Sequence, residues 1–299
     1  DVVYVNLPDG ADPPMGESQM TDVELSQDAA TLLARVTAAL GNPARLGVAF
    51  SGGVDSSVLL AVATRSLGPS RTLAVLGVSA SLAGAERREA HAVAAAIGAP
   101  LVELVTNELE RPEYRANGPD RCFHCKTELF ERIDDELVSR YGLSAVAYGE
   151  NADDARRPDR PGAKAATNHQ VLRPLADAGL TKAEVRRLAA ELKLPVADKP
   201  AAPCLASRIP HFEEVTAEKL QQIDDAEQVL HDLGFGDARV RHHGDVARIE
   251  LVPADLGRAI VEPLRSDLLR GVRAAGFRFV SLDLGGIQSG AFTLPLVTR

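Results

Sequence analysis

Residues 46–57 read Leu-Gly-Val-Ala-Phe-Ser-Gly-Gly-Val-Asp-Ser-Ser, and this stretch decides the fold. Its apolar first half predicts a buried strand over 45–50, and the apolar residues that follow it predict a helix over 55–67. The glycines between them let backbone N–H groups converge on one point, and a helix start adds unpaired N–H groups and a positive dipole end. We therefore expect a cradle for a pyrophosphate group, formed by Ser51, Gly52, Gly53, Asp55, Ser56 and Ser57.

This loop is not a Walker A loop, because no Gly-Lys-Ser/Thr follows the glycines. It resembles the PP-loop of the ATP pyrophosphatase superfamily, which cleaves ATP to AMP and pyrophosphate and activates an oxygen as its adenylate. A plain helix N-cap with a glycine turn is the alternative, and six matching residues directly after a strand argue against it. The resemblance implies ATP with Mg²⁺, and Asp55 would contact the metal directly or through water.

Length and composition are those of an ordinary globular enzyme. The 299 residues allow one large or two ordinary domains, with 45% hydrophobic and 25% charged residues. No apolar run approaches membrane-spanning length and no signal-peptide pattern is present, so we expect a cytoplasmic protein without a membrane partner. The net charge of −9 argues against broad nucleic-acid binding.

Strand and helix patterns alternate after the loop. Strands are expected at 72–79, 101–105 and 144–148, and helices at 86–97, 125–140 and 181–192. This alternation predicts an α/β fold, a parallel sheet with helices on both faces. Ligands of such sheets gather at the carboxyl ends of the strands, where the glycine loop also lies.

The chain is expected to divide into a tail and two domains. Residues 1–20 are rich in proline and glycine and predict a flexible tail, and Met20 would fit a native start. The first domain covers 21–199 and the second, a smaller α+β domain for substrate binding or oligomerisation, covers 200–299, with a linker at 195–203. Second-domain elements are expected as a helix at 216–233, a hairpin of strands 238–243 and 246–251, a helix at 261–275 and a strand at 277–283.

Two helix starts carry a capping-box pattern. Thr21 and Glu24 precede an apolar-periodic stretch that reaches Leu40, and Thr181 and Glu184 open the later helix. In this box the hydroxyl and the carboxylate each accept a hydrogen bond from the other residue's backbone N–H. We therefore expect helices to begin at both sites.

Cys122, Cys125 and Cys204 are the only cysteines. An odd count in a chain of this kind disfavours a disulfide framework. A redox dithiol, half of a zinc site completed by Cys204 and a histidine, and a [4Fe–4S] cluster are the alternatives. The cluster fits the odd count better, because three thiolates leave the fourth iron open for chemistry.

Several blocks together resemble the LarE family, which makes the sulfur-bearing precursor of the nickel-pincer nucleotide cofactor. They are Ser-Gly-Gly-Val-Asp-Ser-Ser (51–57), Asp-Arg-Cys-Phe-His-Cys-Lys (120–126), Gly-Glu-Asn-Ala-Asp-Asp (149–154), Arg-Pro-Gly (160–162), Lys-Pro-Ala-Ala-Pro-Cys-Leu-Ala-Ser-Arg (199–208), Ala-Glu (226–227), Arg-Val-Arg (239–241) and Ala-Arg-Ile-Glu (247–250). These blocks span nearly the whole chain.

The resemblance implies a sulfur transferase. ATP would adenylate a carboxylate of pyridinium-3,5-biscarboxylic acid mononucleotide, and a sulfur nucleophile would displace AMP to leave a thiocarboxylate. Family members with three cysteines carry a [4Fe–4S] cluster that holds the sulfide, which implies Cys122, Cys125 and Cys204 as its ligands. Members with one cysteine sacrifice its sulfur, which would give Cys204 that role. A sulfur donor or cysteine desulfurase and a homo-oligomer, a trimer or a hexamer, are implied partners.

Polar residues suggest where the substrate binds. Arg239 and Arg241 are two apart on an expected strand, so both project to one face, where guanidinium groups suit a nucleotide phosphate. Arg208 follows the cysteine loop and could pair with a phosphate or a carboxylate. The resemblance places Glu227 and Glu250 near the substrate, a surface ion pair being the alternative for Glu227. Asn151 and Asp154 follow a sheet strand and could line the site or cap the next segment.

Three departures from the family pattern concern the substrate more than the chemistry. They are Ile209-Pro210-His211-Phe212 after the Ser-Arg pair, where an aromatic residue and glycine are usual, Asn168 in place of an acidic residue, and the segment 284–292. A tRNA-thiolating PP-loop enzyme, an ammonia-using adenylating ligase and a zinc-stabilised nucleotide-binding protein are the other classes. The tRNA-thiolating enzyme would need a basic RNA-binding face. The ammonia-using ligase would work without the cysteines, and the zinc-stabilised protein would not cleave ATP.

Overall fold

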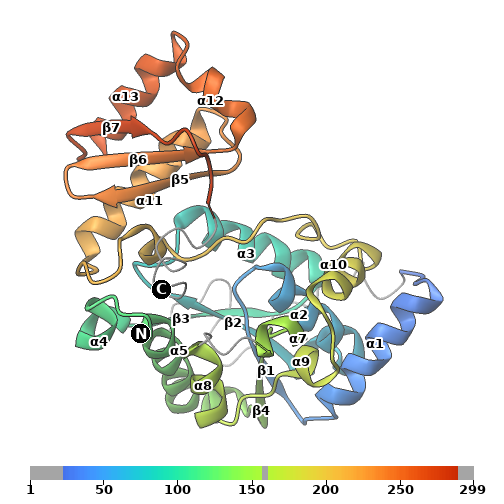
Figure 1. Ribbon diagram of the computed structural model, residues 1–299. Helices are drawn as coiled ribbons and strands as arrows, with labels where there is room; N and C mark the ends of the chain where they lie inside the picture. Colours follow the sequence, from blue (N-terminus) through green and yellow to red (C-terminus); the bar gives the residue numbers. More distant parts are fainter. Residues whose placement is uncertain (1–22, 157–160, 289–299) are drawn as a thin grey trace. The chain divides into compact units, whose positions relative to one another are not determined.

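The structure is a computed structural model that describes residues 23–156 and 161–288 (Figure 1). The described residues form two compact units. The first unit comprises residues 23–79, 86–108 and 122–202, and the second comprises residues 80–85, 109–121 and 203–288. Each unit has its own sheet and its own hydrophobic core.

The sheet of the first unit has four parallel strands in the order β3-β2-β1-β4. The strands are β1 (Leu46–Ala49), β2 (Thr72–Val78), β3 (Leu101–Val105) and β4 (Ala145–Tyr148). This sheet and its flanking helices confirm the predicted α/β class (Figure 1). The chain runs from β1 outward to β3 and then returns to the other side of β1, so the strand order reverses between β1 and β4. Ligands of open α/β sheets bind at such a switch point.

Five of the described helices that precede residue 192 have ten or more residues. They are α1 (Gln27–Leu40), α2 (Val54–Leu67), α3 (Gly84–Ile97), α5 (Arg121–Arg132) and α10 (Lys182–Glu191). The helix α2 is buried along most of its length, which its run of valine, leucine and alanine explains. The capping box predicted at Thr181 and Glu184 is confirmed at the start of α10.

The first helix begins later than the capping box predicted at Thr21 and Glu24 would place it. The helix α1 begins at Gln27, and its N-cap is Ser26, whose hydroxyl accepts a hydrogen bond from the N–H of Ala29 at 3.3 Å. A serine two residues after Glu24 offers an equivalent cap, and local pattern alone does not choose between them. Thr21 and the predicted tail, residues 1–20, lie outside the described residues.

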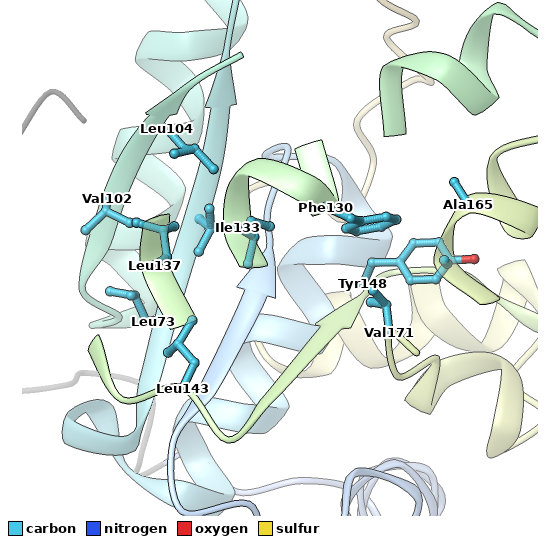
Figure 2. Packing of buried hydrophobic residues seen from close by; sticks show 12 residues of the cluster. Leu73, Val102, Leu104, Phe130, Ile133, Leu137, Leu143, Tyr148, Ala165 and Val171 are labelled. Carbon is cyan, nitrogen blue, oxygen red and sulfur yellow. The ribbon is translucent and has the colours of Figure 1, made fainter. Parts of the chain in front are cut away.

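The core of the first unit gathers strand and helix side chains (Figure 2). Val102 and Leu104 of β3 belong to the same buried cluster as Ile133 and Leu137. The last two lie on a π-helix, Ile133–Val138, which continues α5. The predicted helix at 125–140 therefore begins four residues earlier, at Arg121, and changes its hydrogen-bond pattern midway.

Shorter elements complete this part of the chain and its connections. They are η1 (Pro69–Arg71), η2 (Glu108–Glu110), α4 (Pro112–Arg115), α6 (Ser139–Tyr141), α7 (Ala152–Ala155), α8 (Pro161–Asn168), α9 (Pro174–Asp177) and η4 (Leu205–Arg208). Within the described ranges, no helix combines the length and apolar character needed to cross a bilayer.

The second unit is built on a three-stranded sheet in the order β5-β6-β7. Its elements are α11 (Ala217–Asp232), β5 (Ala238–His243), β6 (Val246–Leu251), α12 (Pro253–Ala259), α13 (Leu264–Ala274) and β7 (Phe279–Leu282). The predicted hairpin is present, because β5 and β6 pair antiparallel on either side of Gly244. The pattern missed α12, and β7 pairs parallel to β6. Phe235, Ile249 and Val272 lie in the core of this unit.

Candidate functional site

Two glycines shape the loop that joins β1 to α2. Gly52 has φ +70°, and a Cβ at this position would lie 3.0 Å from the Cα of Ala90. Glycine alone tolerates both the left-handed backbone and this close approach. Gly53 is the N-cap of α2 and offers no side chain to its first N–H groups. Those N–H groups and the helix dipole can therefore bind an anion.

Serine hydroxyl groups brace the loop from within. The Ser51 and Ser56 hydroxyl oxygens lie 3.2 Å apart, and Ser56 Oγ donates to the carbonyl oxygen of Gly53 at 3.1 Å. Ser57 differs, because its side chain is fully buried and its Oγ makes no hydrogen bond. Of the six predicted cradle residues, Ser57 is thus the one whose hydroxyl lies in the interior.

Strand β4 ends against the first turn of α2. A Cβ on Gly149 would lie 2.6 Å from the backbone nitrogen of Ser56, so no other residue fits there without a shift of the backbone. This approach brings the segment after β4 to the PP-loop. Asn151 caps α7 in that segment, with its Oδ1 accepting hydrogen bonds from the N–H groups of Asp153 and Asp154, both at 3.0 Å.

The amide of Asn151 also joins two carboxylates. Its Nδ2 donates to Asp55 Oδ1 at 3.1 Å and to Asp154 Oδ2 at 3.0 Å. The structure thus brings together three predicted site residues from two loops. Two carboxylates beside a phosphate cradle suit Mg²⁺, which is usually bound by one or two carboxylates together with substrate phosphates.

Lys182 was missed by the sequence analysis. It is the first residue of α10, and its Nζ forms a short ion pair with Asp55 Oδ2, while its backbone N–H donates to Asp153 at 2.8 Å. Its side chain is 39% exposed. The only sequence signal was its place directly after the capping residue Thr181, and that signal did not indicate a partner 127 residues away.

Cys122 and Cys125 lie in the first turn of α5. Their spacing of three puts both thiols on one face of the helix. Cys122 is exposed, Cys125 is partly buried, and neither forms a disulfide. The next residue, Lys126, lies with its Nζ 4.3 Å from the centre of the Tyr148 ring. Across residues 23–156 and 161–288, no three His, Cys, Asp or Glu side chains gather into a metal-binding group.

Cys204 lies in the second unit, as the residue before η4. Its side chain is exposed, and the turn that follows it is held firmly. The N–H of Leu205 donates to the carbonyl oxygen of Ser81 at 3.0 Å, and Arg121 donates to the carbonyl oxygen of Ala206 at 2.9 Å. An exposed thiol on a fixed turn is placed to react or to bind a metal.

A buried network of arginines and glutamates lies beside this turn. Arg208 binds both carboxylate oxygens of Glu227 at 2.9 and 3.1 Å and donates to the carbonyl oxygen of Pro203 at 2.5 Å. Arg241 of β5 pairs with Glu250 of β6 at 2.8 Å and donates to the carbonyl oxygen of Ser207 at 3.0 Å. The network therefore ties the cysteine turn to the hairpin.

The two arginines predicted to share one face of a strand belong to this network. Arg239 and Arg241 do alternate with Val240 along β5, and both are buried. Glu227 is engaged on both oxygens, because its Oε1 also accepts the N–H of Val240 at 2.9 Å. Glu227 thus connects Arg208 to strand β5.

Electrostatics distinguish two of the arginines. Burial lowers the pKa of Arg208, but the neighbouring Glu227 carboxylate outweighs this effect and the pKa is raised. The pKa of Arg239 is lowered by burial and by the positive charges of Arg208 and Arg241. An anion bound beside Arg239 would offset this repulsion.

The parallel sheet with its glycine loop after β1 and polar loop after β4 defines a PP-loop nucleotide-binding protein. A family model described as asparagine synthase matches residues 29–147. The pyridinium-3,5-bisthiocarboxylic acid mononucleotide synthase of Lactiplantibacillus plantarum is 35% identical over 261 residues, which cover 87% of this chain and 93% of the relative. An uncharacterized protein of Synechocystis sp., slr1717, is 41% identical over 243 residues, 81% of this chain and 90% of the relative.

A third relative, the uncharacterized protein MJ0830 of Methanocaldococcus jannaschii, is 31% identical over 168 residues, 56% of this chain and 64% of the relative. The chain belongs to the LarE family of the PP-loop superfamily. These matches confirm the resemblance found in the sequence and support an ATP-using enzyme. The three-cysteine, iron–sulfur type remains a prediction.

Proposed function

We propose that the protein is an ATP-dependent sulfur transferase that converts a carboxylate of pyridinium-3,5-biscarboxylic acid mononucleotide to a thiocarboxylate, for nickel-pincer nucleotide cofactor biosynthesis. The observation that carries the proposal is one chain with a complete PP-loop and an exposed cysteine beside buried arginines. The 35% identity to a pyridinium-3,5-bisthiocarboxylic acid mononucleotide synthase supports this substrate.

The first half-reaction forms an acyl adenylate. A carboxylate oxygen of the substrate attacks the α-phosphorus of ATP, and the bond to the β-phosphate oxygen breaks, which releases pyrophosphate. The N–H groups of Gly52, Gly53 and the start of α2 would hold the phosphates, with the hydroxyl groups of Ser51 and Ser56 as further donors. Mg²⁺, held by Asp55 and Asp154, would neutralise charge on the leaving pyrophosphate.

The second half-reaction brings in sulfur. A sulfur nucleophile attacks the acyl carbon, the bond to the AMP oxygen breaks, and AMP leaves with the electron pair. We propose Cys122, Cys125 and Cys204 as ligands of a [4Fe–4S] cluster, which would supply an open iron to carry a sulfide. In the alternative, the Cys204 thiolate itself attacks, and loss of its Cα proton then breaks its Cβ–Sγ bond to leave dehydroalanine.

The arginines would recognise the substrate. Arg239 and Arg241 present guanidinium groups that suit the nucleotide phosphate, and Arg208 lies beside the cysteine turn. Glu227 and Glu250 would act as positioning residues, because Glu227 pairs with Arg208 and Glu250 pairs with Arg241 and Arg248. A sulfur donor or cysteine desulfurase and a homo-oligomer, a trimer or a hexamer, belong to this proposal.

The test combines metal analysis with a cysteine series in protein purified without oxygen. We expect about four irons with matching sulfide per chain, the content of a [4Fe–4S] centre, in the wild type. Each of the variants Cys122→Ser, Cys125→Ser and Cys204→Ser should lose the bound iron and should no longer form the thiocarboxylate. Each variant should still release pyrophosphate when the pyridinium dicarboxylate is supplied, because adenylation uses no thiol.

Different results would point elsewhere. Loss of sulfur transfer only in Cys204→Ser, without iron in the wild type, would support sacrifice of the Cys204 sulfur. Pyrophosphate release that depends on tRNA or ammonia, and not on the pyridinium dicarboxylate, would overturn the proposed substrate. Zinc in place of iron with no ATP cleavage would overturn the enzymatic proposal.

A further inference from the structure

The two cysteines of α5 lie close enough to react with each other. Cys122 and Cys125 are the second and fifth residues of this helix, and both belong to the first unit. A spacing of three residues in an α-helix leaves the two Cα atoms about 5 Å apart. Disulfide bonds join residues whose Cα atoms are about 4.4–6.8 Å apart. The helix therefore places this pair within the range of a disulfide, although neither cysteine forms one in the structure.

A small movement of the helix start would bring the two sulfur atoms together. Side chains three residues apart on a helix have Cβ atoms about 5–6 Å apart, whereas a disulfide needs about 3.5–4.5 Å. The first turn can supply this movement, because the first N–H groups of a helix have no acceptor within it. Cys122 is one of the residues that contribute these N–H groups. A disulfide here would be exposed and slightly strained, and disulfides with these properties are readily reduced.

The two cysteines differ in their access to solvent. Cys122 is exposed, so a small disulfide such as oxidised glutathione can reach it, whereas Cys125 is partly buried. Thiol–disulfide exchange passes through a mixed disulfide and depends on access to the attacking thiol. A mixed disulfide on Cys122 would have Cys125 as its neighbour on the same face of the helix. Cys122 is therefore suited to react first, and Cys125 to resolve the mixed disulfide.

We propose that Cys122 and Cys125 form a reversible redox pair, oxidised by a low-molecular-weight disulfide, and that the oxidised pair does not support sulfur transfer. The Cys122 thiolate attacks one sulfur of the oxidant, the S–S bond of the oxidant breaks, and one thiol leaves. The Cys125 thiolate then attacks the Cys122 sulfur and releases the second thiol. The pair loses two electrons to the oxidant, and the two protons of the cysteines end on the two released thiols.

The consequence for activity rests on the proposed function, in which both cysteines are cluster ligands. A disulfide removes both sulfur atoms as ligands, because the thiolate is the form that binds metal. The adenylation step uses no thiol and should continue. The oxidised chain should therefore release pyrophosphate without forming thiocarboxylate, and reduction of the disulfide should make the ligands available again.

The test uses the full chain, prepared without iron and incubated with oxidised glutathione in the absence of oxygen. Trypsin cuts after Arg121 and after Lys126, so both cysteines lie in one peptide, Cys122–Lys126. After alkylation of the remaining thiols, we expect this peptide to be lighter by two hydrogen atoms than the reduced peptide and to carry no alkyl group. Dithiothreitol should restore the reduced peptide.

Variants at the three cysteines separate the two steps. Cys125→Ser should keep glutathione bound to Cys122, because no resolving thiol remains. Cys122→Ser should react more slowly, because Cys125 is less accessible than Cys122. Cys204→Ser is the matched control, and its Cys122–Lys126 peptide should form the same disulfide as that of the wild type. A wild-type peptide that stays reduced in excess oxidant, or that keeps glutathione on Cys122, would overturn the redox pair.

A second measurement tests the effect on sulfur transfer. In protein purified without oxygen, the iron content and thiocarboxylate formation should both fall as the oxidised fraction of the peptide rises, while pyrophosphate release stays constant. Full oxidation of the pair with undiminished thiocarboxylate formation would overturn the switch. A reduced wild type that forms no thiocarboxylate would count against the proposed function alone, because the peptide masses are measured without any substrate.

Discussion

Each carboxylate oxygen of Asp55 has a partner from another segment of the chain. One oxygen accepts from Asn151 at 3.1 Å and the other pairs with Lys182. The two donors hold this carboxylate in a fixed orientation beside the PP-loop, and carboxylate oxygens are ligands that Mg²⁺ accepts. In the proposed function, Mg²⁺ on Asp55 would leave the ammonium of Lys182 free to contact the ATP phosphates, because Asp55 and Lys182 lie at the starts of α2 and α10.

Lys182→Gln tests this role. We expect pyrophosphate release to fall about 100-fold, the usual loss when one preorganised charged donor is removed from a site of developing negative charge. Stability should change little, because the Lys182 side chain is partly exposed. Arg187→Gln on the same helix is the control, since Arg187 is half exposed and pairs at 3.7 Å with an exposed aspartate. An unchanged kcat in Lys182→Gln would mean that Lys182 only balances the charge of Asp55 and does not contact the phosphates.

At the scale of elements, the site depends on how closely β4 approaches α2. The close packing at Gly149 sets the position of Asn151 and Asp154 relative to the PP-loop. The strand order explains why these two loops meet, because β1 and β4 are neighbours whose carboxyl ends lie at the switch point.

Gly149→Ala should disturb both the packing and the chemistry. The added methyl group meets backbone atoms of Asp55 and Ser56 within 2.8 Å, so β4 or α2 must shift. We expect the free energy of unfolding to fall by about 1–3 kcal/mol, as for other overpacked sites, and ATP-dependent pyrophosphate release to be lost. Gly77→Ala is the matched control, because its Cβ would come closest to the flexible end of Leu129, at 3.0 Å, and would meet Thr106 at an ordinary contact distance of 3.8 Å. Equal urea denaturation midpoints for the two variants would contradict this account.

Local sequence patterns predicted the elements that are stabilised locally. The strand and helix around Ser51, the capping box at Thr181 and the hairpin at Gly244 each depend on residues close in sequence, and all three are present. The ion pair of Lys182 with Asp55 could not be predicted in this way, because it joins residues 127 apart. The π-helix at Ile133–Val138 was missed because its apolar spacing also fits an α-helix.

The sequence likewise predicted those parts of the candidate site that depend on short motifs and missed those that depend on tertiary contacts. The phosphate-binding loop and the alternation of Arg239 and Arg241 follow from short motifs, and the structure shows the loop shape and the shared strand. Glu227 and Glu250 were expected near substrate, but their roles as partners of Arg208 and Arg241 depend on tertiary packing.

At the scale of the whole molecule, each of the two units is formed by three separate segments of the chain. The predicted boundary at 199/200 is a single point, whereas the second unit also takes residues 80–85 and 109–121 from the connections after β2 and β3. These insertions hold the cysteine turn and the segment after it. Asn117, fully buried with φ +55°, donates to the carbonyl oxygens of Ile209 at 3.3 Å and Pro210 at 2.7 Å.

The stability of the first unit toward acid should depend on one buried carboxylate. Glu103 of β3 is 1% exposed and receives Arg87 Nε at 2.7 Å and Nη2 at 2.5 Å, together with His91 Nε2 at 2.7 Å. Burial raises the pKa of Glu103, but the hydrogen bonds from Arg87 and His91 outweigh it, and the pKa lies below its ordinary value. This carboxylate therefore stabilises the fold above its unfolded-state pKa, and the contribution is lost as pH falls through the lower folded-state pKa.

Glu103→Gln should lower the free energy of unfolding at neutral pH by about 1–2 kcal/mol, because it replaces charge-assisted hydrogen bonds to Arg87 by weaker neutral ones, while water screens the charge of the 43% exposed Arg87 side chain. The difference from the wild type should shrink below about pH 4, near the ordinary glutamate pKa, because the carboxylate of the unfolded wild type takes up a proton there before that of the folded state does. Urea denaturation across pH 3–8, with hydrogen exchange at β3, measures this difference. Glu110→Gln, at an exposed glutamate, is the control and should match the wild type at every pH. A loss in Glu103→Gln that stays constant down to pH 3 would show that packing around Glu103, and not its charge, stabilises the edge of the sheet.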